Sequence, residues 1–168
     1  MVETSYSRLH DWHHDDYDTV REHIYTQIGD LGSIRLFGSQ VLCAIYIRPL
    51  MNPRTGLQYT AKQQAEDIAQ GKTLMVLKTG PSAFSGHAEY IAETWGQEGS
   101  PKPDDWVFAR ASTGEPMHIC LDGARLVTHE DRRGDGQPSY EAFQNGWPCR
   151  VLMDTDIIGL ISKPHQVV

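Results

Sequence analysis

The chain lacks most features of an exported, membrane-spanning or redox-active protein. Its 168 residues include three cysteines, Cys43, Cys120 and Cys149, with no C-x-x-C pair. Three cysteines cannot all pair within one chain, and their spacing fits no common zinc or redox motif. No apolar run approaches the roughly 20 residues of a membrane helix, and residues 1–16 lack the apolar core of a secretory signal. These absences predict reduced thiols and a protein made in a cytoplasm, with no membrane contact.

Basic residues are also scarce. The chain has 15 Lys and Arg against 22 Asp and Glu, a formal net charge of -7 and a pI near 5.5. Proteins that bind nucleic acids draw most of their affinity from clustered cations that release counterions from phosphates. The charge balance therefore argues against a nucleic-acid partner and favours protein partners.

Patterns that carry catalysis are missing too. Ser82, Ser85 and His87 lie outside any G-x-S-x-G elbow, and no phosphate-binding glycine loop is present. His118 and Cys120 share one face of an expected strand, where packed residues are more common than a catalytic pair. An N-terminal cluster offers metal-ligand side chains in no known ligand spacing, so a solvated acidic arm is the simpler interpretation and a structural metal the alternative: His10, Asp11, His13, His14, Asp15, Asp16 and Asp18. We expect no enzyme activity, no cofactor and no metal.

The chain is rich in short strand patterns separated by turns. β-branched and aromatic runs predict paired strands within residues 33–48 about a turn at Gly38-Ser39, and further strands from Gly71 and over Trp106–Ala109. A hairpin is predicted across Asp122-Gly123. The last two strands are expected at CRVLM and IIGLI, on either side of Asp154-Thr155-Asp156. Many short strands with few helices predict an all-β, or mainly β, fold closed into a small barrel.

Two units are expected along the chain. Residues 1–32 form a polar N-terminal arm with a short amphipathic helix over Asp18–Ile28. Residues 33–168 form the barrel domain, which carries long loops at 50–70, 82–103 and 130–146. A short helix is possible over residues 61–69, and a helical turn over residues 89–95.

The order of these pieces resembles a known family. GKTLMVLKTGPSAF, then PKPDDWVFARASTGEPMHI, then PCRVLMDTDIIGLI are similar to the GroES co-chaperonin family, particularly its divergent branch encoded by bacteriophages. The correspondence spans roughly residues 40–161, about three quarters of the chain. Each motif is only a strand and a turn, and it is their order that carries the resemblance. It implies a GroES-like β-barrel.

The resemblance also implies a partner-binding loop. In the family, the loop after the first strand carries an apolar tripeptide that docks onto a chaperonin, and the matching residues here are Gly56, Leu57, Gln58, Tyr59 and Thr60. Gln58 replaces the central apolar residue. An unpaired amide in an apolar groove costs about 1–3 kcal/mol, which a multivalent ring can offset through avidity. The arm and the 130–146 loop have no counterpart in a minimal co-chaperonin.

Aromatic residues outside the expected core strands favour binding. Tyr and Trp are enriched at interface hot spots, and a local role as lids over the barrel is the alternative. The residues expected to bind a partner are Trp12, Tyr17, Tyr25, Tyr140, Phe143 and Trp147. Trp95 belongs to the same group, whereas Trp106 and Phe108 are expected in the core.

Together these observations favour a non-enzymatic, GroES-like structural protein of a bacteriophage virion. It would act as a capsid decoration or cement protein, or in head assembly, and would be assembled in the host cytoplasm. Its partners would be other copies of itself, as a homo-oligomer, and phage capsid proteins. The alternative is a phage co-chaperonin whose ring caps a host GroEL-type chaperonin through the loop around Leu57 and Tyr59.

Overall fold

The structure is a mainly-β fold built on one antiparallel sheet. In the computed structural model of the protein, the described residues are 17–47, 66–68, 70–85, 93–96, 99–121, 123–126, 146–162 and 164. The elements are α1 (Tyr17–Ile28), β1 (Gln40–Ile45), β2 (Thr73–Thr79), β3 (Trp106–Ala109), β4 (Glu115–Cys120), β5 (Gly123–Leu126), β6 (Trp147–Met153), a 3-10 turn at Asp154–Asp156 and β7 (Ile157–Leu160). Residues 66–68 and 93–95 are also helical. The prediction of a mainly-β chain is confirmed.

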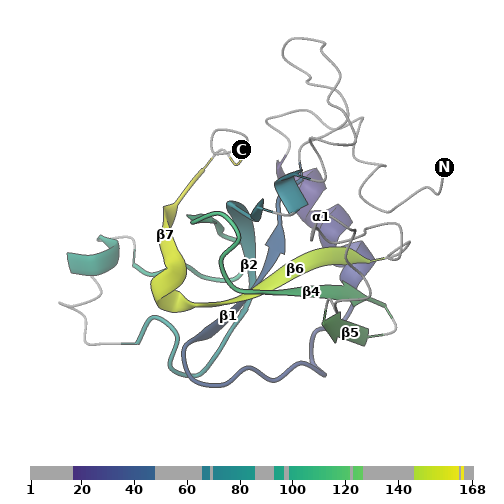
Figure 1. The fold of residues 1–168 in the computed structure, drawn as a ribbon, viewed down its shortest axis with the longest axis horizontal. Coiled ribbons are helices and arrows are strands. Elements are labelled where there is room, and N and C mark those ends of the chain that lie inside the picture. The colour runs from purple at the N-terminus through teal and green to yellow at the C-terminus, as the bar shows by residue number, and fades with distance from the viewer. Residues whose placement is uncertain are drawn as a thin grey trace, which may run out of the picture.

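The strand order is β5-β4-β6-β1-β2-β3-β7, and every pair is antiparallel (Figure 1). The central strands β1 and β2 are apolar along almost their whole length, and most of their residues are buried. Such continuous burial means that both faces of these strands are covered. The core therefore lies on both sides of the sheet's centre.

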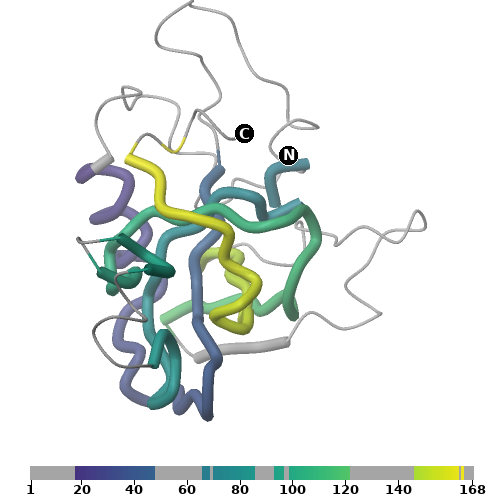
Figure 2. The backbone as a smooth tube through the Cα atoms, turned by 90° about the vertical axis from the view of Figure 1, so that its left-hand side faces the viewer, coloured from purple at the N-terminus to yellow at the C-terminus, as the bar shows by residue number. Residues whose placement is uncertain are grey.

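The sheet is strongly curled. Only the three residues Asp154–Asp156 separate β6 from β7, although β1, β2 and β3 lie between these two strands in the sheet. Four strand spacings in a flat sheet would amount to roughly 19 Å, whereas the step from Met153 to Ile157 reaches at most about 14 Å. The sheet must therefore bend so that β7 comes back beside β3. Figure 2 shows this bend in the yellow part of the chain.

The curl does not close into the predicted barrel. Among the described strands the order is linear, with β5 and β7 at its two ends. Figure 1 places these two strands at opposite margins of the sheet. An open sheet keeps the edge strands that a closed barrel would remove. The outer side of β7 therefore has no described strand beside it.

Helix α1 forms where the apolar spacing predicts a helix, and its apolar side packs on the sheet. Val20, Ile24 and Ile28 are each at most 1% exposed. The helix contacts β4 and β6, and His23 stacks edge-on against Trp147 at 5.8 Å between ring centroids. The described part of the N-terminal arm thus belongs to the same core as the sheet.

Three predictions about local structure were wrong in detail. Residues 34–37 are not a strand, and β1 pairs with β2 and β6 instead. The hairpin turn lies one residue earlier than predicted, because Cys120 pairs with Gly123 and leaves residues 121 and 122 between them. Trp147 lies inside β6 and is fully buried, with its indole N–H donating to the Ile45 carbonyl at 2.7 Å. Trp147 is a core residue and not a surface contact.

Candidate docking site at the β7 edge

The last strand presents an apolar row to solvent. Ile158 and Leu160 are 57% and 39% exposed, whereas Ile157 is 6% exposed. Residues two apart point to the same face of a strand, so Ile158 and Leu160 form one outward row. Gly159 lies close against the core, because a Cβ at this position would be 2.8 Å from the Phe108 ring. The inward side of β7 is therefore packed and its outward side is apolar and open.

β7 is also an edge strand. It pairs with β3 through Val107–Leu160 and Phe108–Gly159, and no other described strand pairs with it. Edge strands are often protected by lysine, proline or an inward charge. β7 has the sequence IIGL, which contains none of these. An edge of this kind is a template on which a further strand can add.

A hollow adjoins this edge. It has a volume of about 610 Å³ and opens between the end of β7, the N-terminal part of α1 and the loop before β3. Its apolar lining comes from Trp106, Leu160 and Ile161, and its charged lining includes Arg21, Lys102 and Asp104. Most of the lining is polar, so the apolar surface near this edge comes mainly from the row of Ile158 and Leu160 itself.

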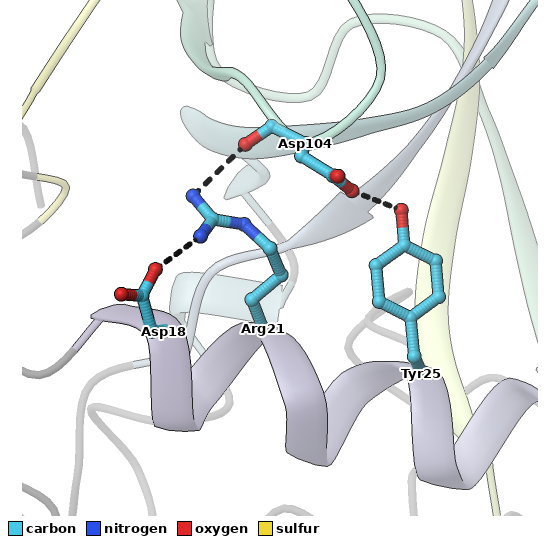
Figure 3. A network of polar contacts seen from close by, with 4 residues as sticks. All are labelled: Asp18, Arg21, Tyr25 and Asp104. Carbon is cyan, nitrogen blue, oxygen red and sulfur yellow. Dashed lines mark hydrogen bonds and ion pairs between the residues drawn. The ribbon is translucent and has the colours of Figure 1, made fainter.

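One wall of the hollow is fixed by contacts between α1 and Asp104. Arg21 donates to the Asp18 carboxylate at 2.5 Å and to the Asp104 carbonyl at 3.1 Å. Tyr25, one turn further along the helix, donates its hydroxyl to the Asp104 carboxylate. Figure 3 shows Arg21 and Tyr25 reaching from one side of α1 to the two ends of Asp104.

Asp104 holds an unusual backbone conformation. Its φ is 79°, in the left-handed region that aspartate tolerates better than most side chains. The Asp104 amide donates to the Val76 carbonyl at 2.8 Å, and the Val76 amide donates to the Asp105 carbonyl at 2.9 Å. The turn before β3 is therefore tied to β2 on one side and to α1 on the other.

Arg21, Tyr25 and Asp104 form a structural contact and not a catalytic site. Burial of the Tyr25 phenol raises its pKa well above the ordinary value, and the hydrogen bond to the Asp104 carboxylate raises the pKa further, while Arg21 lowers it. A phenol that holds its proton so firmly is a donor and not a general base. Tyr25 and Arg21 set the position of α1 against the loop.

Other reactive groups are withdrawn from solvent. Cys43 and Cys149 are buried free thiols, and burial raises the pKa of both well above the usual range. His118 is 5% exposed inside β4. Within the part of the chain that the structure describes, no group of three or more His, Cys, Asp or Glu is placed to hold a metal ion. In the same residues, no helix is long and apolar enough to cross a bilayer.

Among the described residues that were predicted to bind a partner, Tyr25 alone adjoins the hollow, through its hydrogen bond to Asp104. Only the helical backbone of Tyr17 is described. The loop residues Gly56, Leu57, Gln58, Tyr59 and Thr60 lie outside the described residues, as do Trp12, Tyr140 and Phe143. Trp95 packs edge-on against Phe84, with 5.2 Å between ring centroids.

Sequence reasoning missed Ile158 and Leu160. The run IIGLI predicts a strand, but the pattern alone does not show which face of that strand is buried. The glycine at its centre was the available signal, since a glycine in a strand often marks close approach of a neighbour.

No protein-family model matches the chain, and no curated protein matches it.

Proposed function

We propose that this chain is a non-catalytic assembly protein of a bacteriophage virion, with a GroES-like arrangement of strands. It serves as a capsid decoration or cement protein, or as a head-assembly component. Its partners are phage capsid proteins and other copies of itself. The resemblance in the order of strand motifs supports the family, and the apolar edge of β7 supports binding to another protein.

The observation that carries the binding role is the row of Ile158 and Leu160 on an edge strand. Large exposed apolar side chains beside unpaired backbone groups favour a partner that adds a strand and covers the row. Burying one Ile or Leu side chain contributes about 1.5–3 kcal/mol. Two such side chains supply enough free energy to affect assembly measurably, because about 1.4 kcal/mol is a tenfold change in affinity.

The test of the virion role is a protein census of purified particles of the phage that encodes the chain. We expect the chain in mature particles at a copy number set by the capsid lattice. Its absence from particles that are otherwise complete rejects the virion role.

The docking edge is tested with variants of the same particles. Ile158→Glu together with Leu160→Glu should lower incorporation tenfold or more, because two charges would enter an apolar contact. Leu121→Glu is the matched control, since Leu121 is 73% exposed and lies at the tip of the β4–β5 hairpin. If the double variant and Leu121→Glu are incorporated equally well, the interface does not lie at the β7 edge.

A second candidate is a co-chaperonin that caps a host chaperonin. One observation favours it: the Tyr46 amide donates to the Thr73 carbonyl at 2.9 Å, so the end of β1 and the start of β2 are neighbours on either side of an interval that includes residues 48–65. The resemblance places Gly56–Thr60 in that interval. A ring that suppresses the chaperonin's ATPase, and loses this effect with Leu57→Asp, would favour the cap. A ring without effect on the ATPase would reject it.

A further inference from the structure

Arg150 is the most deeply buried cation of the described residues. It lies in the middle of β6 and is 4% exposed. Its guanidinium donates to three backbone carbonyl oxygens, those of Thr113 at 3.2 Å and of Gly114 and Ile68 at 3.5 Å. A buried charge is costly unless hydrogen bonds compensate for lost water. These carbonyls therefore belong to the arrangement that keeps Arg150 inside.

The three carbonyls come from two separate connections. Ile68 belongs to the described residues 66–68 and 70–72, which precede β2 and are called the stem below. Thr113 and Gly114 lie between β3 and β4. The backbone ties the same two connections together, since the Ser112 amide donates to the Gln70 carbonyl at 2.6 Å. Arg150 thus lies beneath the point where the two connections meet.

Gly71 packs directly against the guanidinium of Arg150. It has a φ of +53°, and a Cβ at this position would be 2.5 Å from the Arg150 Nε and 2.8 Å from its Cδ. Real Cβ atoms do not approach neighbours so closely, so only glycine allows the backbone to lie here without displacing the arginine. Gly71 in the stem is therefore in close packing contact with the Arg150 side chain.

We propose that Arg150 is a positioning residue that fixes the stem against the connection between β3 and β4. Arginine suits this role because its planar guanidinium offers five N–H donors in a rigid fork, whereas lysine offers one compact ammonium. One side chain can then hold carbonyls of two connections at once. The consequence for binding rests on the co-chaperonin candidate, because that candidate assigns docking to Leu57, which precedes the stem in the sequence.

Hydrogen exchange tests the positioning directly. The reporter amides are those of Gly71, which donates to Asp67, and Ser112, which donates to Gln70, and the reference amides are Val76 and Ile161. In both Arg150→Met and Arg150→Lys we expect exchange of the reporters to rise tenfold or more, equivalent to about 1.4 kcal/mol. The reference amides should change far less. Arg35→Met is the charge-matched control, since Arg35 is exposed over Phe37.

A pair of glycine variants tests the same contact from the other side. Gly71→Ala should raise exchange at Ser112 because the new methyl group displaces the guanidinium. Gly38→Ala is matched to it, since Gly38 has a φ of +55° and a Cβ added there would have no atom within 4 Å. The two variants share the backbone strain and differ in the contact with Arg150. This pair decides the matter if Arg150→Met fails to fold.

Several outcomes would overturn the proposal. A local positioning role is rejected if the exchange rates of the reporter amides do not change in Arg150→Met, or if Arg150→Lys keeps the slow exchange of the wild type. It is also rejected if the exchange rate rises as much at Val76 as at Gly71. Equal effects of Gly71→Ala and Gly38→Ala would do the same.

Binding to a chaperonin ring is measured separately. Weaker binding by Arg150→Lys, about tenfold, together with loss of binding by Leu57→Asp, supports the functional consequence. Faster reporter exchange without any chaperonin binding by the wild-type chain keeps the positioning role and rejects the co-chaperonin candidate.

Discussion

At the scale of a single residue, Tyr25 shows how α1 is held on the sheet. Its hydroxyl donates to the carboxylate of Asp104, and the Asp104 carbonyl accepts a hydrogen bond from Arg21. We predict that Tyr25→Phe lowers the free energy of unfolding by about 1 kcal/mol, the usual net value of one hydrogen bond. Denaturant titration measures this change. Asp104→Asn is the control, because an amide keeps the acceptor and tolerates the same backbone, and it should cost less.

The same residue gives a pH dependence. The folded state raises the pKa of Tyr25 above its ordinary value of 10.0, so the folded chain retains a proton that the unfolded chain loses. The stabilisation is complete below pH 10 and declines as the pH rises further toward the folded-state pKa. Stability of the wild type should therefore fall more steeply above pH 10 than that of Tyr25→Phe. Parallel curves for the two proteins would contradict this account.

At the scale of elements, Gly146 sets the start of β6. Its φ is +91°, and a Cβ would lie 2.2 Å from the Ile119 carbonyl oxygen on the neighbouring strand β4. We predict that Gly146→Ala destabilises the fold by more than the roughly 1–3 kcal/mol of backbone strain alone, because β4 must also move. Gly96→Ala is the matched variant, with a φ of +82° and open space around the Cβ. Thermal unfolding of the pair checks this, and equal midpoints would contradict it.

The strands that the sequence predicts well are those whose apolar residues are nearly continuous. β2, β3 and β6 appear where the β-branched and aromatic runs place them. The run at residues 34–37 has similar residue types but is not a strand, because β1 already pairs on both sides with β2 and β6. A local pattern cannot show that both neighbours of a strand come from distant parts of the chain.

Side-chain roles depend on such distant pairing as well. Trp147 follows a polar, glycine-rich stretch, and its position suggested a surface residue. It is buried because Gly146 turns the chain directly into a central strand, where the indole N–H reaches Ile45. Ile158 and Leu160 are the reverse: their sequence resembles a core strand, yet the pairing order leaves β7 at an edge. Residue type sets apolarity, whereas the order of strands decides which apolar residues face solvent.

At the scale of the whole molecule, the bend between β6 and β7 joins segments far apart in the chain. The Asp154 amide donates to the Ser39 carbonyl at 2.9 Å, and its carboxylate accepts from the Phe84 amide at 2.9 Å. Phe84 has a φ of 55°, a strained conformation for an aromatic residue, and this bond helps to hold it. One aspartate therefore ties the start of β1 and the turn after β2 to the bend that carries β7 back to β3.

We predict that Asp154→Ala lowers the free energy of unfolding by about 1–3 kcal/mol, because the Phe84 amide loses its acceptor. Asp154→Asn should retain most of the stability, since its amide oxygen accepts the same bond. Denaturant titration separates the two. The loss should also loosen the pairing of β7 with β3, so the Ile161 amide, which donates to the Trp106 carbonyl at 2.9 Å, should exchange faster in Asp154→Ala. Faster exchange at Ile161 in Asp154→Asn as well would mean that the charge, and not the hydrogen bond, holds the bend. Unchanged exchange in both variants would show that the curl depends on packing of the core alone.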